Sequence, residues 1–361
     1  MPPLPDWKGP YFLLEAEGFE VWLLNPRQVK SVPGRPKTDK LDSIWLAKVA
    51  EKGMCQPSLV HPQPVRELRS LTRYRRSLVE DRTREMQRTE KLLEDAQIKI
   101  SSVISDIFGR SGRRMLAALT EGERDAAALA RLADHRIRAT AEELAEALNT
   151  RFFTGHHAQI LSMMLTNVDR MSEQIAALDA QITEAARPFA EQLAQLREVT
   201  AVGEASAVEL IAEIGVDMTR FPTGAHLVSW AKFCPQTHES AGKRKNKGRG
   251  KGNRWLARTL GTIVFAAGKT DSFFGERYRR VAKRRGNHKA IVATGNTVLK
   301  AVHYLLAHPG VHFTDLGSDF YKSKIHLDRQ VRNAARQLSA LTGQKLAIRA
   351  GKVVITEPDV T

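Results

Sequence analysis

Two long charged segments carry narrow stripes of apolar residues. Along Val65–Ile100 and Ile160–Leu196, many apolar positions are spaced by three, four or seven residues, with Arg, Glu and Gln between them. This spacing places the apolar side chains along one seam of a helix, as in a coiled coil. We expect the two helices to pair as an antiparallel arm, with short Ala- and Leu-rich helices between them and a bend or break at Pro188.

The first sixty residues have an α/β pattern. "YFLLEAEG" predicts a helix that ends at Gly18, and Phe19–Leu24 predicts a buried strand. "TDKLDSIWLAKVAEKG" predicts a helix that begins at Thr38 or Asp39 and ends near Gly53. Because one strand and two helices cannot close a core alone, we interpret this segment as the tail of a larger sheet domain whose opening strands are absent.

Apolar helices dominate from Val199 onward. A glycine turn in "TAVGEASA" leads into a helix that ends at Gly215, and a helix in "FPTGAHLVSWAKFCP" precedes a basic loop and three further helices. The tail from about Lys322 is expected to be weakly structured, with a small hairpin in "KLAIRAGKVVIT". The chain is therefore predicted to be mainly α with a partial α/β segment at its N-terminus. The expected domains are residues 1–60, 61–197, 198–322 and 323–361.

Composition narrows the class of protein. A chain of 361 residues is long enough for more than one core. No apolar run approaches the roughly 20 residues that span a bilayer, and "MPPLPDWKGP" lacks the pattern of a secretory signal. The two cysteines, Cys55 and Cys234, lie far apart and lack metal-ligand spacing. We expect a cytoplasmic protein with reduced thiols, no zinc site and no membrane partner.

Charge is concentrated in one region. The net charge is +16, and the segment from Ser240 to Ala290 holds sixteen basic and two acidic residues. A concentrated positive field suits a polyanion. Because no amphipathic membrane helix accompanies it, we favour nucleic acid over acidic lipid as the partner.

Ser240 stands directly ahead of the basic run. A serine hydroxyl is a poor nucleophile unless a base, a metal or positive charge favours its alkoxide. Basic residues would hold a phosphodiester there and stabilise negative charge in the transition state. The residue pattern leaves a second interpretation open, in which Ser240 is an ordinary loop residue. The basic residues concerned are Lys243, Arg244, Lys245, Lys247, Arg249, Lys251 and Arg254.

Two carboxylates open the helix after Thr38. Asp39 and Asp42 are spaced i, i+3 and so share one face of its first turn. Together they could hold a Mg²⁺ that bridges phosphate oxygens. The alternative is that they favour the positive end of the helix dipole and bind no metal.

Two further elements are candidates for phosphate contact. "TAVGEASA" resembles a helix-hairpin-helix turn, which would present backbone N–H groups near Gly203 to a phosphate. Ala201 stands where such turns usually have a second glycine. A second basic cluster spans Arg277–Lys289, and some of its members must cover a solvated helix face. The members expected to contact phosphate are Arg279, Arg280, Arg284 and Arg285.

These parts together resemble a known family. "NPRQVKSVPGRPKTDKLDSIWLA", "LRSLTRYRRSLVEDRTREMQR", "AEIGVDMTRFPTGAHLVSWAKFCP" and "ESAGKRK…KGNRWL" follow one another as in the insertion-sequence 110 family of transposases. The resemblance runs from about Tyr11 to Tyr321. "TDKLD" is a weak motif by itself, whereas "RFP…SWAKFCP" followed by "ESAGKRK" at this spacing is specific.

The resemblance implies a fold and a chemistry. It implies a RuvC-like (RNase H-like) N-terminal domain with a DEDD carboxylate set, a coiled-coil arm, and a C-terminal domain with a catalytic serine. Ser240 matches that serine, and Asp39 and Asp42 match the last two carboxylates. The implied activity is recombination of DNA through a covalent serine–DNA intermediate by a homo-oligomer, guided by a structured RNA, at the bacterial nucleoid and with Mg²⁺ as cofactor.

The sequence departs from the family pattern at its start. The strands that carry the first Asp and the Glu are expected upstream of Tyr11, and the sequence holds neither, so we expect a truncated set and weak metal binding. Three hypotheses follow: a serine-dependent DNA transposase, a catalytically impaired nucleic-acid-binding remnant of one, and a structure-specific repair factor that depends on the "TAVGEASA" turn alone.

Overall fold

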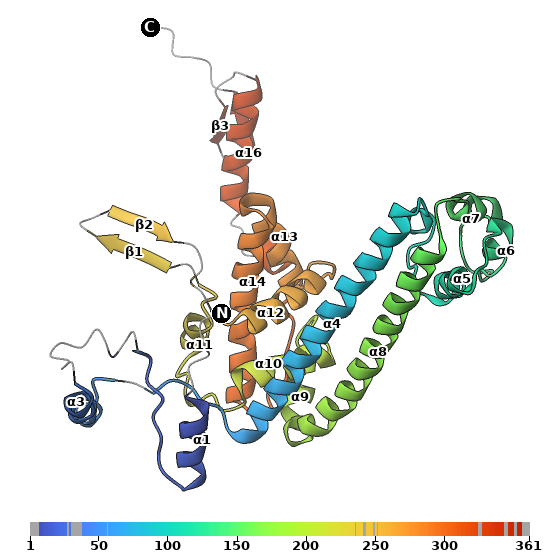
Figure 1. The fold of residues 1–361 in the computed structure, drawn as a ribbon. Coiled ribbons are helices and arrows are strands. Elements are labelled where there is room, and N and C mark those ends of the chain that lie inside the picture. Colours follow the sequence, from blue (N-terminus) through green and yellow to red (C-terminus); the bar gives the residue numbers. More distant parts are fainter. Residues whose placement is uncertain are drawn as a thin grey trace. The chain divides into compact units, whose positions relative to one another are not determined.

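The chain forms two compact units, residues 1–66 and 67–361. The computed structural model describes residues 7–26, 29, 38–55, 57–234, 236–240, 243–247, 250, 252–323, 327–342, 346–349 and 352–355. The described residues are mainly helical, as the sequence predicts for the chain as a whole, and the described strands form two short antiparallel hairpins (Figure 1).

The first unit contains helices α1 (Lys8–Ala16) and α3 (Asp39–Glu51). Positive φ angles of 80° at Gly18 and 63° at Gly53 follow these helices, so both glycine stops are confirmed. Thr38 is the N-cap of α3, with an extended backbone and no side-chain cap hydrogen bond.

The strand predicted over Phe19–Leu24 is wrong, because the described residues of this unit contain no strand. One backbone hydrogen bond, from the Ser58 amide to the Leu23 carbonyl at 2.7 Å, joins this segment to a later one. A strand needs a ladder of such bonds. The apolar run is left partly in solvent, with the Phe19 side chain 64% exposed.

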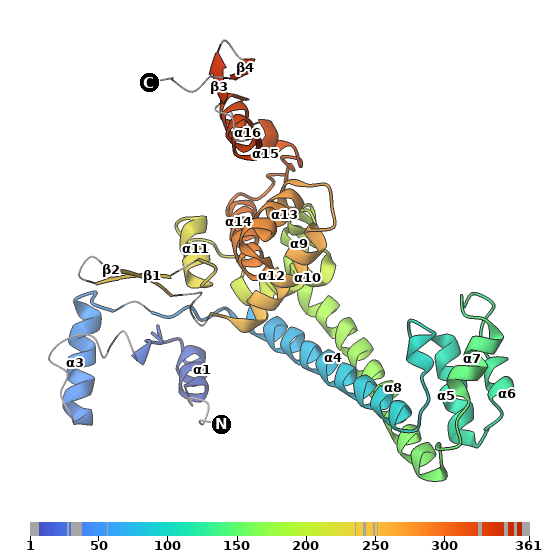
Figure 2. The ribbon, with the colours of Figure 1, turned by 90° about the horizontal axis from the view of Figure 1, so that it is seen from above.

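Two long helices of the second unit run antiparallel. They are α4 (Gln63–Asp95), which begins in the first unit, and α8 (Gly155–Ala186). Figure 1 and Figure 2 both show them side by side. Contacts pair early α4 residues with late α8 residues, as antiparallel packing requires. The contacts are Arg75 with Asp179, Arg82 with Ser172, and Glu85 with Asn167.

The predicted antiparallel pairing is therefore confirmed, whereas a coiled-coil supercoil stays a prediction. Leu78 packs with Ile175 and Leu178 in the apolar seam between the helices. The break at Pro188 is also confirmed: α8 gives way to a 3₁₀ turn, η2 (Arg187–Phe189), before α9 (Ala190–Arg197).

Short helices fill the segment between α4 and α8, as predicted. They are η1 (Ile100–Ser102), α5 (Arg110–Glu121), α6 (Ala126–Ala130) and α7 (Ala141–Leu148). Their apolar faces form one cluster with the adjoining ends of α4 and α8, in which Met115, Leu129 and Leu161 have no exposed surface. This segment therefore has a core of its own.

The C-terminal helices pack around α14 (Asn287–Ala307). It contacts α9, α11 (Gly224–Trp230), α12 (Arg254–Ala267) and α13 (Phe273–Arg285), and α10 (Glu204–Ile214) contacts α9 and α12. α14 is long and apolar enough to cross a membrane, but half of its most apolar window is buried in the protein. We interpret it as the central core helix.

Two predictions for the C-terminal third need correction. The expected basic loop contains the hairpin of β1 (Gln236–Ser240) and β2 (Lys243–Lys247). Only two residues, Ala241 and Gly242, separate these strands, which is the commonest hairpin length. The expected weakly structured tail contains α15 (Phe320–Ser323) and α16 (Leu327–Thr342).

The sequence of α16 explains the second correction. Its apolar positions recur at helical spacing, from Leu327 through Val331 and Ala335 to Leu338. The small hairpin predicted after it is confirmed as β3 (Leu346–Arg349) paired with β4 (Lys352–Ile355).

The core around α5 to α8 yields a stability prediction. Leu161→Ala should lower the free energy of unfolding by about 3 kcal/mol, because it opens a cavity in a fully buried cluster. Met163→Ala, on the same helix at a position 69% exposed, should change it by less than about 0.5 kcal/mol. Urea denaturation followed by circular dichroism compares the two, and equal losses would contradict the assignment of Leu161 to a core.

Candidate active site and nucleic-acid interface

Ser240 lies at the closed end of the hairpin formed by Gln236–Lys247, which we call the serine hairpin. Its cross-strand partner is Lys243, and the next pairs are Glu239 with Arg244 and His238 with Lys245. Directly opposed residues of antiparallel strands have Cα atoms about 4.5–5.5 Å apart. The backbone alone therefore brings the candidate nucleophile beside the basic run. Lys247 pairs with Gln236, whereas Arg249 and Lys251 lie outside the described residues.

Both ends of the serine hairpin lead into tightly packed residues. On the entering side, Phe233 is 1% exposed and its carbonyl accepts a hydrogen bond of 3.0 Å from Asn296 of α14. On the leaving side, a Cβ added to Gly252 would lie 2.5 Å from the Ala231 carbonyl oxygen. This approach is too close for any other residue, so the chain needs glycine there.

Asn253 ends the leaving side and begins α12. Its Oδ1 accepts hydrogen bonds from the amides of Trp255, at 3.0 Å, and Leu256, at 3.4 Å, which makes it the N-cap. Its Nδ2 donates at 2.5 Å to Oε2 of Glu213 on α10. The exposed Arg254 lies with its guanidinium 4.7 Å from the centre of the Trp255 indole.

Glu213 is the most enclosed acidic group of this region, at 2% exposure. Arg73 of α4 binds its carboxylate in a bidentate pair with both distances 2.7 Å. Arg69, one turn earlier, lies 3.7 Å from Oε2 and donates to the carbonyls of Ala212 and Glu213. Those carbonyls belong to the last turn of α10, where a cation is favoured. Burial lowers the pKa of Arg69, and the charge of Glu213 opposes that shift.

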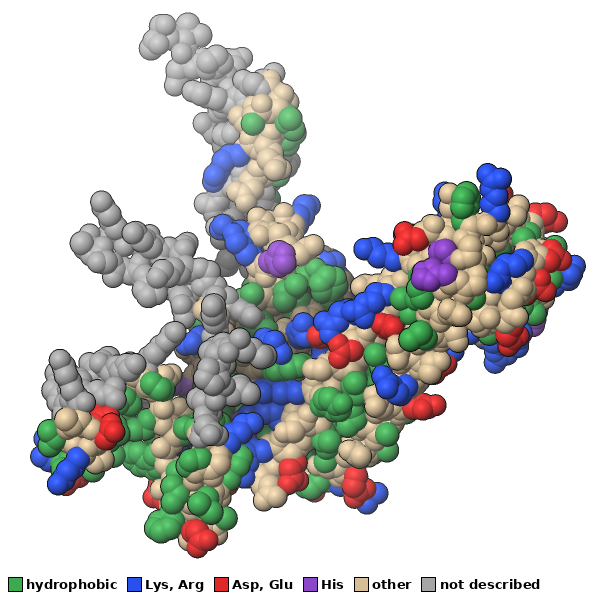
Figure 3. Space-filling model, viewed as in Figure 1, with side chains coloured by type: hydrophobic (Ala, Val, Ile, Leu, Met, Phe, Trp, Pro, Cys, Tyr) green, Lys and Arg blue, Asp and Glu red, His purple; other side chains and the backbone are tan. Residues whose placement is uncertain are grey.

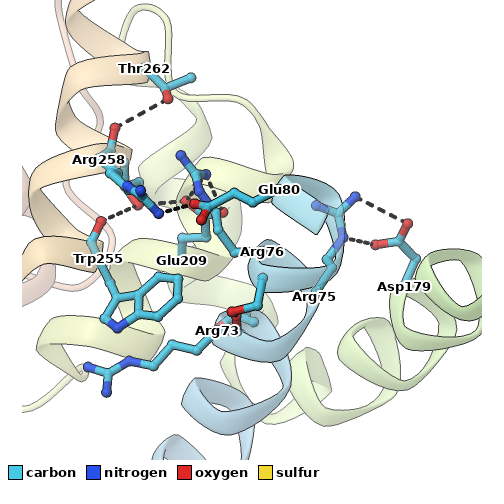
Figure 4. Close-up of polar contacts among 12 residues, drawn as sticks. Arg73, Arg75, Arg76, Glu80, Asp179, Glu209, Trp255, Arg258 and Thr262 are labelled. Atoms are coloured by element: carbon cyan, nitrogen blue, oxygen red, sulfur yellow. Dashed lines mark hydrogen bonds and ion pairs between the residues drawn. The ribbon is translucent and has the colours of Figure 1, made fainter. Parts of the chain in front are cut away.

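A second set of contacts lies one turn away on the same helices. Arg76 donates to Glu209 at 3.0 Å, and the Thr259 hydroxyl donates to the same carboxylate at 2.6 Å. Arg258 of α12 pairs with Glu80 of α4. Figure 4 shows these contacts on one side of α4 and the Arg75–Asp179 pair, which leads to α8, on the other. Polar contacts thus link helix α4 to α10 and α12 on one side and to α8 on the other.

Lys and Arg side chains gather along the start of α4 and beside the helices that it contacts, with acidic side chains among them (Figure 3). Much of this positive charge is therefore engaged within the protein. The sequence interpretation did not identify Glu213 or Asn253. The available signal was the pair of glutamates, Glu209 and Glu213, inside the otherwise apolar run "AVELIAEIG", because buried carboxylates need partners.

The turn before α10 has the strained backbone of a glycine position. Ala201 has φ = 68°, in the left-handed region, and the next residue, Val202, is buried at 4% exposure. Gly203 is the N-cap of α10, with no side-chain cap and open space around its Cα. The Thr200 hydroxyl donates to Asp315 at 2.7 Å. The turn is fixed in place, and its amides near Gly203 remain candidate phosphate contacts.

The predicted phosphate contacts on α13 differ from one another in the structure. Arg279 donates to the carbonyls of Gly268 and Thr270, at 3.1 and 2.9 Å, so its guanidinium already has partners within the protein. Arg280 lies 4.6 Å from the centre of the Tyr321 ring. Arg284 and Arg285 are exposed in the last turn. These last two are the freest of the four to contact a phosphate.

Asp39 and Asp42 occupy the first turn of α3, in the first unit. The Asp42 amide donates to the Thr38 carbonyl at 2.8 Å, which places both aspartates at the start of the helix. No group of three or more His, Cys, Asp or Glu side chains suited to a metal occurs among the residues that the structure describes. Magnesium commonly takes one or two carboxylates and completes its shell with water and phosphate. The pair suits that partial role.

Two segments of the chain match family models of transposases. Residues 4–98 match a family model for DEDD transposases of the IS110 type, described as "Transposase". Residues 193–279 match the model "Transposase IS116/IS110/IS902 family". The chain belongs to the IS110 family of transposases. The first match contains Asp39 and Asp42, and the second contains Glu213, Ser240 and Asn253.

A relative of this transposase occurs in Streptomyces coelicolor. The "Insertion element IS110 uncharacterized 43.6 kDa protein" is 26% identical over 280 residues. The alignment covers 71% of this chain and 67% of the relative. A divalent metal is a general expectation for a DEDD domain, in agreement with the carboxylate pair of α3.

The turn before α10 yields a prediction in which a substitution to glycine stabilises the protein. Ala201→Gly should raise the free energy of unfolding by about 0.5–1 kcal/mol, because it relieves a left-handed residue. Ala205→Gly, four residues later inside α10, should lower it by about as much. Urea denaturation of both variants checks the pair, and a loss of stability in Ala201→Gly would show that the turn does not hold this conformation.

Asp315 yields a pH prediction. Burial raises its pKa, but hydrogen bonds from the Phe273 amide, the Thr200 hydroxyl and the Gly317 amide outweigh burial and lower the pKa overall. A carboxyl with a lowered folded-state pKa stabilises the fold above its unfolded pKa of about 3.9, and this stability is lost as pH falls through the folded value.

The stability difference between the wild type and Asp315→Asn should therefore be full above about pH 5 and shrink below about pH 4. Urea denaturation across this range measures it. A difference that stayed constant down to pH 3 would mean that the Asp315 carboxylate contributes nothing through its charge.

Proposed function

We propose that this transposase cuts and rejoins DNA through a covalent bond between Ser240 Oγ and a DNA phosphate. The supporting observation is the backbone pairing of Ser240 with Lys243 at the closed end of the serine hairpin. A transposase must break and remake phosphodiester bonds, and a hydroxyl beside cations is suited to that chemistry.

In the proposed step, Ser240 Oγ attacks the phosphorus and loses its proton to a base or to water. The new bond is Oγ–P, the bond that breaks joins phosphorus to a deoxyribose oxygen, and that oxygen takes up a proton as the leaving hydroxyl. Lys243, Arg244 and Lys245 stabilise the charge on the phosphate oxygens. Attack by a hydroxyl of another DNA end reverses the step, so no ATP is consumed.

Asp39 and Asp42 are proposed to hold Mg²⁺. The ion would supply positive charge to a DNA phosphate when it is bound. We assign the first unit to a partial RuvC-like domain and the α4–α8 pair to a coiled-coil arm. We also propose that the enzyme works as a homo-oligomer with a structured guide RNA, which suits the excess of basic charge in the C-terminal region.

A second candidate is a DNA-binding remnant without catalysis. It is favoured by one observation: no group of three or more His, Cys, Asp or Glu side chains suited to a metal occurs in the described part of the chain, so Asp39 and Asp42 belong to no larger acidic cluster there. Both candidates use the same basic surface, so binding does not separate them. The formation of a covalent protein–DNA adduct does.

Ser240→Ala should abolish covalent adducts on a DNA duplex that carries the element end, because the substitution removes the hydroxyl oxygen that the proposal assigns to the ester. Equilibrium affinity for the same duplex should stay within about threefold, since phosphate contacts dominate binding. Thr237→Ala on the same strand is the matched control and should keep full adduct yield. Denaturing gels measure the adduct, and fluorescence anisotropy measures binding.

Adducts that persist in Ser240→Ala would remove Ser240 as the nucleophile. A wild-type chain that binds DNA but yields no adduct would support the remnant. Binding should weaken with salt: for each tenfold rise in salt concentration, log K should fall by about 0.9 for each phosphate neutralised on duplex DNA.

A further inference from the structure

The carboxylate of Glu213 joins three segments that are distant in the sequence. Two are helices, α4 through Arg69 and Arg73, and α10 through Glu213 itself. The third is the exit of the serine hairpin, through Asn253. We call these four residues the Glu213 clamp. It differs from an ordinary helix–helix ion pair because one of its donors belongs to the segment that leaves the candidate active site.

Asn253 has two separable roles in the clamp. Its Oδ1 caps α12, and a serine or aspartate side chain performs that role nearly as well. Its Nδ2 donates to Glu213, and neither serine nor aspartate supplies that amide donor in its place. An N-cap alone therefore does not require asparagine, but the bond to Glu213 does.

Stability alone is a weak reason to bury this group. Removing a carboxylate from water is costly, and a buried ion pair often contributes no more than well-packed apolar residues would. What the clamp adds is geometry, because Arg73 binds in a planar bidentate pair and the Asn253 amide approaches from another segment. This arrangement fixes the leaving side of the hairpin to α4.

Helix α4 extends from the clamp to the separate core around α5 to α8. Its 33 residues correspond to about 50 Å of helix. We propose that Glu213 and Asn253 are positioning residues that hold the serine hairpin in register with α4 and make its chemistry depend on the placement of the arm. The proposal rests on the proposed function of Ser240 for its catalytic consequence, whereas the mechanical link does not.

The test uses two substitutions that keep the N-cap and a matched control. Asn253→Ser removes only the amide donor, and Asn253→Asp places a second carboxylate against Glu213. Asn167→Ser is the control. It removes an amide group that donates at 3.2 Å to Glu85, a glutamate of α4 that is also buried, at 7% exposure. The control lies on α8, away from the hairpin.

The first measurement does not depend on catalysis. Hydrogen–deuterium exchange of the full chain should be several-fold faster at the amides of Gln236–Lys247 in Asn253→Ser, and faster still in Asn253→Asp. The amides of α12 should keep their rates, because its cap remains. Asn167→Ser should leave the hairpin unchanged. Hairpin exchange equal to that of the wild type in both Asn253 variants would overturn the proposal.

The second measurement is the rate of adduct formation at saturating DNA. A positioning role predicts a rate about 10- to 100-fold lower in Asn253→Ser, with DNA affinity within threefold of the wild type. A purely structural role would lower the unfolding midpoint and leave this rate unchanged in the folded protein, and that result would also overturn the proposal.

The two proposals fail in distinguishable ways. Full adduct formation in Asn253→Ser, together with none in Ser240→Ala, would refute the clamp and leave the nucleophile standing. Absence of adduct in the wild type would refute the nucleophile, and the exchange measurement would then decide on the clamp.

Discussion

The Glu213 carboxyl group lies in a place with almost no access to water. Such a group is tolerated only if other groups replace the lost hydration: here Arg73 and Asn253 donate hydrogen bonds to the carboxylate, and Arg69 adds a positive charge 3.7 Å away. To supply them, α4, α10 and the start of α12 must adopt one mutual arrangement. The contacts of Glu209 and Glu80 further along α4 require the same arrangement of these helices. These carboxylates therefore connect α4 to α10 and α12 at several points, beside buried apolar side chains of α4 such as Leu68.

The parts of the fold that periodicity controls could be predicted from the sequence. Helices α4 and α8 and the break at Pro188 follow from apolar spacing and from the missing amide of proline. The strand over Phe19–Leu24 could not, because a strand exists only where a neighbour supplies a ladder, and local sequence does not contain the neighbour. The serine hairpin was not predicted, because its many charged residues are typical of a loop. The two-residue separation of its strands, which is a common hairpin length, was not recognised as a signal.

The candidate site divides in the same way. Ser240 and its basic neighbours stand out because they are contiguous in the sequence, and so do Asp39 and Asp42. Glu213 and Asn253 are 40 residues apart, and nothing local indicates that they touch. Arg279 stays a predicted phosphate contact, but its guanidinium also donates to the carbonyls of Gly268 and Thr270, which the sequence did not indicate. Composition identifies charge, whereas only the structure shows which charges are already engaged.

The place of α14 in the chain has a consequence for biosynthesis. This apolar helix is flanked in space by α11, α12 and α13, all of which precede it in the sequence. A ribosome delivers the chain from its N-terminus, so these three helices leave the exit tunnel first. When the apolar helix α14 emerges, the three helices against which it packs have already been synthesised. The order of the helices in the sequence thus shortens the time in which the exposed α14 can bind a membrane, a chaperone or another nascent chain.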